Sequence, residues 1–278
     1  MNRLTQEKQK QVIAALVEGN SIRATVRMTG VAKNTIVKLL AEVGKACAEY
    51  QDKVFHDLTC TKIQCDEIWS FCYAKQKNVP EDKQGQFGYG DVYTWIAICA
   101  DSKLVPSWYV GRRDYQSAKY FIEDLAKRLG NRVQLTTDGH KAYLQAVEDA
   151  FGQEIDYAQL IKLYGSDRDS EVKYSPAQCT GAIKERIQGN PDMKHVSTSY
   201  VERQNLTMRM SMRRFTRLTN GFSKKVENHA HAISLHYMYY NFCRIHQTLR
   251  VTPAMEAGVT ENLWDIEDIL NLLNSPKV

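Results

Sequence analysis

Three acidic residues stand where they could carry out chemistry together. Asp66 lies on the polar side of a segment with alternating hydrophobicity, Asp138 directly follows a short apolar run, and Glu202 lies in the first turn of a basic helical segment. Carboxylates can hold two divalent ions about 3.5–4 Å apart at a phosphodiester, one activating the attacking oxygen and one stabilising the leaving oxygen. Such oxygen ligands suit Mg²⁺, for which Mn²⁺ can substitute. The three acids are therefore our candidate catalytic and metal-binding residues.

Each acid also has a purely structural interpretation. Asp66 fits a solvent-facing strand residue, and Asp138 fits a turn that caps the following helix. Ser199 and Glu202 have the spacing of a capping box, which would explain the glutamate without any chemistry. Glu67 competes with Asp66, although the alternation directs its side chain into the core. The acids become a site only if the fold brings them together.

The hydrophobic pattern predicts a mixed α/β sheet around these acids. Period-two alternation from Ile63 to Tyr73 indicates the first strand. Further strands are predicted over 92–100, 104–110, 133–137 and 155–164, helices over 115–129, 139–151, 199–219 and 224–243, and an irregular insertion over about 165–197. If the first and fourth strands are neighbours, Asp66 and Asp138 face each other across one edge of the sheet.

The first 45 residues have the pattern of a helix-turn-helix. Helices are predicted over 6–19, from an N-cap at Ser21 to Gly30, and over 32–43. A tight glycine-containing turn before a helix that starts with polar residues fits a helix that reads base edges. The candidate DNA-reading residues are Lys33, Asn34, Thr35 and Lys38. An ordinary three-helix scaffold without DNA contact is the alternative.

Positive charge is concentrated in two blocks. Residues 1–45 hold eight Lys and Arg against three acids, and residues 199–225 hold seven against Glu202 alone. Two such blocks suggest a polyanionic partner touched at two places, whereas a solvated helix face would explain either block alone. In the second block Glu202, Asn205, Arg209, Arg213 and Thr216 recur at helical spacing as one polar stripe. Its candidate DNA contacts are Arg203, Arg209, Arg213, Arg214, Arg217, Lys224 and Lys225.

Composition narrows the class of protein. The chain has 278 residues and a net charge of +5, and no run approaches the roughly 18 apolar residues of a membrane span. Its N-terminus is polar, unlike a signal peptide. The seven cysteines form no CxxC pair, so we expect free thiols in a reducing cytoplasm and no structural zinc site.

Longer motifs resemble transposases of the insertion-sequence-one family. The segment 197–225, which contains Glu202, resembles the glutamate motif of that family. The segments 65–70 (CDEIWS) and 136–143 (TTDGHKAY) resemble its two aspartate motifs. The segment 240–246 (YNFCRIH) with Thr252, Pro253 and Ala254 is similar to the C-terminal end of such enzymes. The resemblance covers about residues 61–257.

The resemblance implies a ribonuclease H-like catalytic domain with an Asp-Asp-Glu triad, carried here by Asp66, Asp138 and Glu202. It also implies Mg²⁺-dependent cleavage at the element's ends, followed by attack of the freed 3′-hydroxyl on target DNA. Arg209 matches a basic residue that many of these enzymes place two turns after the glutamate. Members of the family carry a cysteine zinc finger before the helix-turn-helix, and this chain has none, so we expect its recognition of the element ends to differ.

From these observations we expect a helix-turn-helix domain at 1–45, a linker at 46–60, a catalytic domain at 61–250 and an acidic tail at 251–278. The tail would form a short amphipathic helix that docks on a partner. The expected partner is DNA, bound by a homodimer or larger homo-oligomer, with no membrane association, in the nucleoid of a bacterial or archaeal cell. The alternatives are a catalytically inactive helix-turn-helix protein and a simple metal-dependent nuclease.

Overall fold

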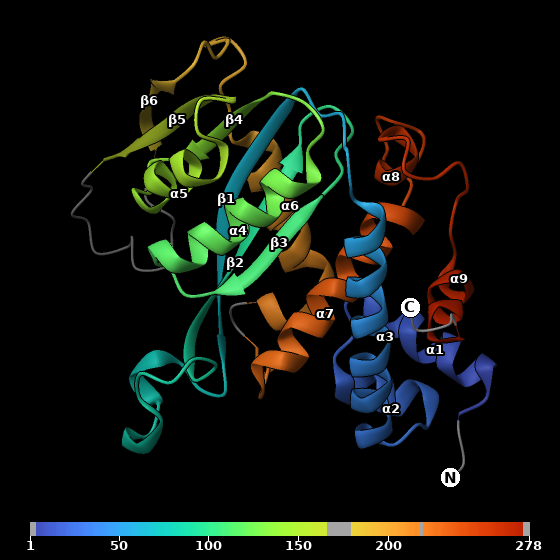
Figure 1. The fold of residues 1–278 in the computed structure, drawn as a ribbon. Helices are drawn as coiled ribbons and strands as arrows, with labels where there is room; N and C mark the ends of the chain where they lie inside the picture. The colour runs from blue at the N-terminus through green and yellow to red at the C-terminus, as the bar shows by residue number, and fades with distance from the viewer. Residues whose placement is uncertain (1–3, 166–178, 217–218, 275–278) are drawn as a thin grey trace.

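A six-stranded mixed sheet forms the centre of the molecule, in the order β3-β2-β1-β4-β5-β6 (Figure 1). The structure is a computed structural model that describes residues 4–165, 179–216 and 219–274. The strands are β1 (Lys62–Cys72), β2 (Gly90–Cys99), β3 (Ser107–Gly111), β4 (Val133–Asp138), β5 (Ile155–Tyr164) and β6 (Cys179–Gln188). The predicted mixed α/β architecture and its five strands are confirmed, and the sixth strand is an addition.

The register of β1 and β4 decides where the two aspartates lie. β1 runs antiparallel to β2 and parallel to β4, with Gln64 opposite Thr136. Asp66 and Asp138 each lie two residues beyond this pair, so the parallel register places them at the same level of the sheet. The predicted neighbourhood of the first and fourth strands is confirmed.

The predicted irregular insertion over 165–197 is wrong in its second half. Residues 179–188 form β6, which pairs antiparallel with β5 from Tyr157 opposite Gln188 to Tyr164 opposite Cys179. β6 is an edge strand, exposed along most of its length. An exposed edge strand buries neither face, so its sequence lacks the alternation from which strands are predicted. Residues 166–178 lie outside the described residues.

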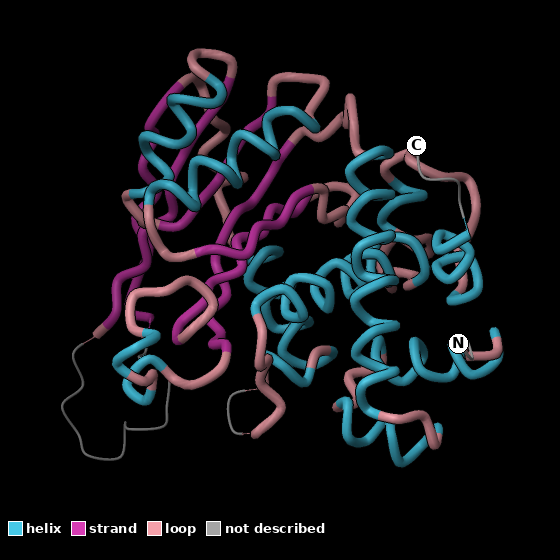
Figure 2. The backbone as a smooth tube through the Cα atoms, turned by 60° about the horizontal axis from the view of Figure 1, so that its bottom comes forward, coloured by secondary structure: helices cyan, strands magenta, loops and turns pink. Residues whose placement is uncertain are grey.

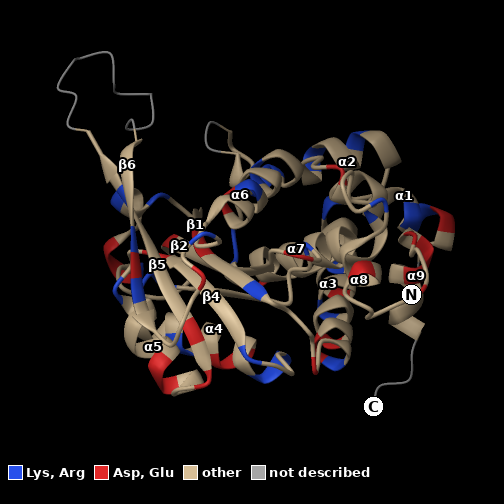
Figure 3. Cartoon of the chain, turned by 90° about the horizontal axis from the view of Figure 1, so that it is seen from above, with Lys and Arg blue, Asp and Glu red and all other residues tan. Residues whose placement is uncertain are grey.

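Helices cover both faces of the sheet. Figure 3 shows α4 (Tyr115–Arg128) and α5 (Ala142–Phe151) on one side and α6 (Ser199–Ser211) on the other. The predicted basic helix over 199–219 is too long, because the backbone becomes extended at Met212 and a 3-10 turn follows over Arg213–Phe215. Arg213 and Thr216 therefore leave the predicted polar stripe. α7 (Val226–Met238) continues as a π-helical turn over Tyr239–Cys243.

The N-terminal helices are α1 (Gln6–Val17), α2 (Ile22–Thr29) and α3 (Lys33–Val54). The predicted boundaries of α2 are confirmed: the Ser21 side chain accepts from the Ala24 amide, and Gly30 ends the helix with a φ of 71°. α3 extends well past its predicted end at residue 43. Residues 46–54, for which the sequence left open a linker or an extra helix, therefore continue this helix, while the division into domains stays a prediction.

The terminal segments of the chain pack on each other (Figure 2). The short helices α8 (Pro253–Glu256) and α9 (Ile266–Asn271) follow α7. In α9, Ile269 and Leu270 are buried, and Lys10 of α1 lies 3.3 Å from Glu267. The acidic tail thus docks on the chain's own first helix. Among the described helices none is both long and apolar enough to cross a membrane.

A close crossing of α3 and α7 joins the N-terminal helices to the rest of the core. At Gly44 an added Cβ would lie 2.5 Å from the carbonyl oxygen of His231. The Ser234 hydroxyl donates to the Gly44 carbonyl at 2.7 Å. Glycine is required here because any side chain would push the two backbones apart.

Gly44→Ala is therefore expected to lower the free energy of unfolding by about 1–3 kcal/mol through overpacking. The loss is expected even though alanine favours a helix over glycine by up to about 1 kcal/mol. Urea denaturation measures the effect. Lys45→Ala, at the next and exposed position, is the control and should change stability by no more than about 0.5 kcal/mol. A Gly44→Ala protein as stable as wild type would contradict the close crossing.

Candidate functional site

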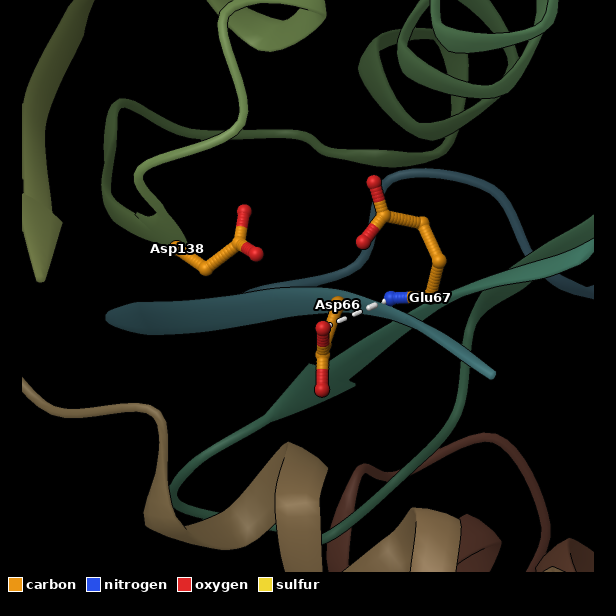
Figure 4. Close-up of side chains that lie close together, drawn as sticks. All are labelled: Asp66, Glu67 and Asp138. Atoms are coloured by element: carbon orange, nitrogen blue, oxygen red, sulfur yellow. Dashed lines mark hydrogen bonds between the residues drawn. The ribbon is translucent and has the colours of Figure 1, made fainter. Parts of the chain in front are cut away.

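Three acidic side chains lie close together where β1 and β4 are neighbours, and Figure 4 shows the carboxylates of Glu67 and Asp138 facing each other on one side of β1 and that of Asp66 on the other. Ligand atoms of Asp66, Glu67 and Asp138 all lie within 4.8 Å of one another. Among the described residues this is the one group of three or more His, Cys, Asp or Glu side chains with the spacing of a metal site. The structure thus brings together two of the three predicted residues, with Glu67 in place of Glu202.

Local hydrogen bonds fix the two aspartates. The Glu67 amide donates to Asp66 Oδ1 at 2.8 Å, and Asn205 Nδ2 of α6 donates to Asp66 Oδ2, also at 2.8 Å. Asp138 ends β4, and its Oδ1 accepts from the His140 amide at 2.9 Å. This is the turn interpretation of Asp138, and it leaves Oδ2 directed away from the turn and 3.9 Å from Arg113. Turn formation and a role in the site are therefore compatible.

Glu67 lies on the core side of β1, as the alternation predicts. Its side chain is 2% exposed, yet its carboxylate approaches that of Asp138 (Figure 4). Its Oε1 has no hydrogen-bond partner and lies 3.6 Å from His140 Nε2 and 3.8 Å from Arg113 Nε. A buried carboxylate oxygen without a hydrogen bond lowers the stability of the fold, and a cation bound at this oxygen would remove that loss.

The proximity of these acids changes their protonation. Burial, followed by the charge of Asp138, raises the pKa of Asp66 to about 6. Burial, followed by the charges of Asp138 and Asp66, raises the pKa of Glu67 to about 8, against the opposing effect of Arg113. Near neutral pH without metal, Glu67 therefore holds a proton, which a bound cation would replace. The electrostatics favour an additional cation at this edge.

Glu202 borders the group without belonging to it. Lys162 Nζ of β5 donates to Glu202 Oε1 at 2.5 Å, and the Thr198 hydroxyl also donates to that oxygen. The predicted capping box is wrong, because Thr198 is the N-cap, Ser199 is already helical, and the Thr198 side chain accepts no hydrogen bond from a backbone amide of the first turn. Glu202 still lies near enough to Asp66 for its charge to raise the pKa of that residue. α6 is thus placed over the carboxylates, and Lys162 holds the glutamate.

Two residues of the site were not predicted from the sequence. Lys162 lies on β5 between Ile161 and Leu163, where alternation indicates only a polar face. Arg113 follows β3 and reaches both Glu67 and Asp138. Neither residue lies in a recognisable motif, and their roles follow from strand order, which local sequence does not encode.

The predicted DNA-binding residues divide between a groove and other surfaces. A groove of about 850 Å³ lies between α2–α3 and the chain that follows α6. Of the predicted residues it is lined by Lys33, Asn34, Arg213, Arg214, Lys224 and Lys225. Thr35, Lys38, Arg203 and Arg209 are not among its lining residues, and Arg217 lies outside the described residues. The two basic blocks, expected to make contact at two places, meet in one groove.

Comparison with known proteins gives only distant likenesses. No family model and no curated protein matches the chain. A piggyBac transposase, solved as a synaptic complex with hairpin DNA, aligns with 98% of this chain and 71% of its own at 10% identity and a TM-score of 0.44. Mos1, solved as a strand transfer complex, aligns with 86% of this chain and 77% of its own at 11% identity and a TM-score of 0.25. We therefore base the function on the site.

The raised pKa values predict how stability depends on pH without added metal. Asp66 shifts from 3.8 to about 6 and Glu67 from 4.5 to about 8, so the folded state binds more protons than the unfolded state between these values. These two groups should therefore make stability fall as pH rises from about 4 to about 8. Glu67→Gln removes the larger shift and should flatten this fall.

Denaturation midpoints in EDTA at several pH values measure the difference between wild type and Glu67→Gln. Glu154→Gln is the control, because that side chain is 85% exposed and its removal should leave the pH profile unchanged. Parallel profiles for wild type and Glu67→Gln would show that Glu67 is not held in the way described.

Proposed function

We propose that the protein is a DNA transposase with a ribonuclease H-like catalytic region, which cleaves at insertion-sequence ends and joins the freed 3′-hydroxyl to target DNA. One observation carries the proposal: Asp66 and Asp138, far apart in sequence, meet at adjacent parallel strand positions beneath the helix whose first turn carries Glu202. A sheet edge with clustered carboxylates fits metal-assisted phosphodiester chemistry. We propose transposition rather than another metal-assisted phosphodiester reaction because the segments around these acids resemble transposase motifs.

The carboxylates fit a hard divalent cation. Asp66 and Asp138 would hold it, with Glu67 close by, and oxygen ligands alone favour Mg²⁺ or Mn²⁺ over softer metals. When bound, the ion supplies Lewis-acid stabilisation of charge on phosphate and lowers the pKa of an attacking hydroxyl. Such an ion would give Glu67 Oε1 the partner that it lacks, and it would reduce the repulsion among the carboxylates.

The chain's own residues prepare this site in distinct ways. Asn205 and the Glu67 amide each donate to one oxygen of Asp66 and so fix the orientation of its carboxylate. Lys162 pairs with Glu202, whose side chain is 39% exposed, and in this proposal Glu202 exchanges that lysine for the metal site when DNA binds. Glu202 would then complete the triad, and Lys162 would be released toward a phosphate.

Its partner is DNA in this proposal, and its assembly is at least a dimer because two element ends must be joined. The N-terminal helices would recognise the ends as a helix-turn-helix. We place such a protein with the nucleoid in the cytoplasm of a bacterial or archaeal cell. A DNA-binding protein without catalysis is disfavoured by the carboxylate cluster, since negative charge facing phosphates weakens binding unless a cation intervenes.

The proposal predicts that Asp138→Asn abolishes strand transfer while leaving DNA binding intact. Loss of one ligand should lower the rate by about 10²- to 10⁴-fold, because metal stabilisation contributes several kcal/mol and each 1.36 kcal/mol is tenfold. The assay mixes protein, Mg²⁺, labelled element-end DNA and a target plasmid. Glu148→Gln, an exposed acid on α5, is the control and should retain activity.

The products decide between the candidate functions. Joined products with wild type support a transposase. Cleavage without joining indicates a metal-dependent nuclease, and a salt-sensitive mobility shift alone indicates a DNA-binding protein. Full strand transfer by Asp138→Asn would refute the assignment of the acids.

A further inference from the structure

The groove described above has two walls that come from opposite ends of the sequence. One wall carries Arg23 and Arg27 of α2 and Lys33 at the start of α3. The other carries four cations that follow α6: Arg213, Arg214, Lys224 and Lys225. No Asp or Glu is among the described residues that line it. A groove lined by cations on both sides is a surface for a polyanion.

Backbone packing fixes the spacing of the walls. At Gly19, in the turn between α1 and α2, an added Cβ would lie 3.1 Å from the carbonyl oxygen of Ser211 at the end of α6. Figure 3 shows α6 reaching toward α2, with Lys and Arg on both. The groove floor is apolar, formed by Val17, Leu40 and Met212, which are buried. The groove is therefore built into the core rather than formed by loose side chains.

The cations of the groove are not neutralised within the chain. None of the seven forms an ion pair with a described acid, whereas Arg128 and Arg132 elsewhere are each paired with aspartates. Arg214 is half-buried, and its one described hydrogen bond is to the Ser223 hydroxyl at 2.8 Å. Burial, followed by the charge of Arg23 on the opposite wall, lowers the pKa of Lys224. Cations from both walls thus repel one another across the groove, and an anion between them would remove that repulsion.

We propose that this groove binds the phosphate backbone of a single DNA duplex, with cations of both walls contacting the same segment. The inference rests on the proposed function only for the choice of DNA as the polyanion. Lys33 and Asn34 at the start of α3 would lie beside that backbone, near the base edges. The two basic blocks then form one binding site instead of two.

α6 sets the distance from the groove to the carboxylates. From Glu202 to Ser211 the helix rises by about 14 Å, which is about four base pairs of duplex at 3.4 Å each. A duplex seated in the groove would therefore lie within half a turn of the Asp66–Asp138 edge. The same duplex could contact the groove and present a phosphate to the carboxylates.

The test measures binding of a labelled mixed-sequence duplex of about one helical turn, about 34 Å long, as a function of salt. Asp138→Asn protein in EDTA is used, so binding is scored without catalysis. One variant adds Arg27→Gln with Lys33→Gln, and another adds Arg213→Gln with Lys224→Gln. All four side chains are exposed. Each pair should reduce the slope of log affinity against log salt by about 1.8, and the combination by about 3.6.

Two controls separate local contact from general charge. Lys45→Gln with Lys53→Gln removes the same charge from α3 at about 18 and 30 Å from Lys33, beyond the screening length of about 10 Å at 0.1 M salt, and should leave the slope unchanged. Arg27→Lys with Lys33→Arg keeps the charge and should keep the slope.

The stoichiometry and the slopes decide the outcome. One duplex per chain, with both walls contributing to the slope, supports the single groove. Two duplexes per chain, or a slope that only one wall affects, would overturn it. Binding through both walls by a protein that never joins DNA would leave the groove standing while the transposase proposal fails.

Discussion

Repulsion among Asp66, Glu67 and Asp138 constrains everything else at the β1–β4 edge. The parallel register of the two strands forces these carboxylates to within 4.8 Å, and burial strengthens the repulsion because the local dielectric is low. The chain opposes it with Arg113, amide donors and the Asn205 side chain. These groups are too few to neutralise the cluster when all three acids are ionised, so the cluster costs stability unless a proton or a cation is bound. The carboxylate charge that these groups do not neutralise is the physical basis for proposing a cation there.

α6 connects this edge to the basic groove. Its first turn carries Glu202, its next turn binds Asp66 through Asn205, and its last residue touches the turn at Gly19. The early end of the helix at Ser211 matters, because the extended backbone after it carries Arg213 and Arg214 out to the groove. A helix continuing to residue 219 would have kept Arg213 in line with Glu202. α6 therefore contributes residues to the acidic site near its start and borders the basic groove at its end.

Strands were predicted correctly from the sequence where the hydrophobic pattern matches the burial of the side chains. Alternation and apolar runs predicted β1 and β4, and Asp138 at the end of a strand followed from its position alone. Exposed β6 was missed because it buries neither face. Glu202 was predicted as a member of the triad, with a capping box as the alternative, whereas its partner Lys162 comes from a distant strand. Contacts set by strand order and helix ends are non-local, so no local periodicity reports them.

Because the N-terminal helices are packed firmly on the rest of the fold, the position of the groove relative to the carboxylates is fixed. α3 runs without a break from Lys33 to Val54, crosses α7 at Gly44, and is backed by a tail that pairs Glu267 with Lys10. A DNA-binding domain joined by a flexible linker would not fix the position of a bound phosphate relative to the carboxylates. In the proposed function, helices fixed to the sheet would restrict where bound DNA can lie, and that restriction would remove orientational freedom before any chemical step. The continuous core is thus the feature that would let DNA recognition at α2–α3 direct a phosphate to the carboxylates.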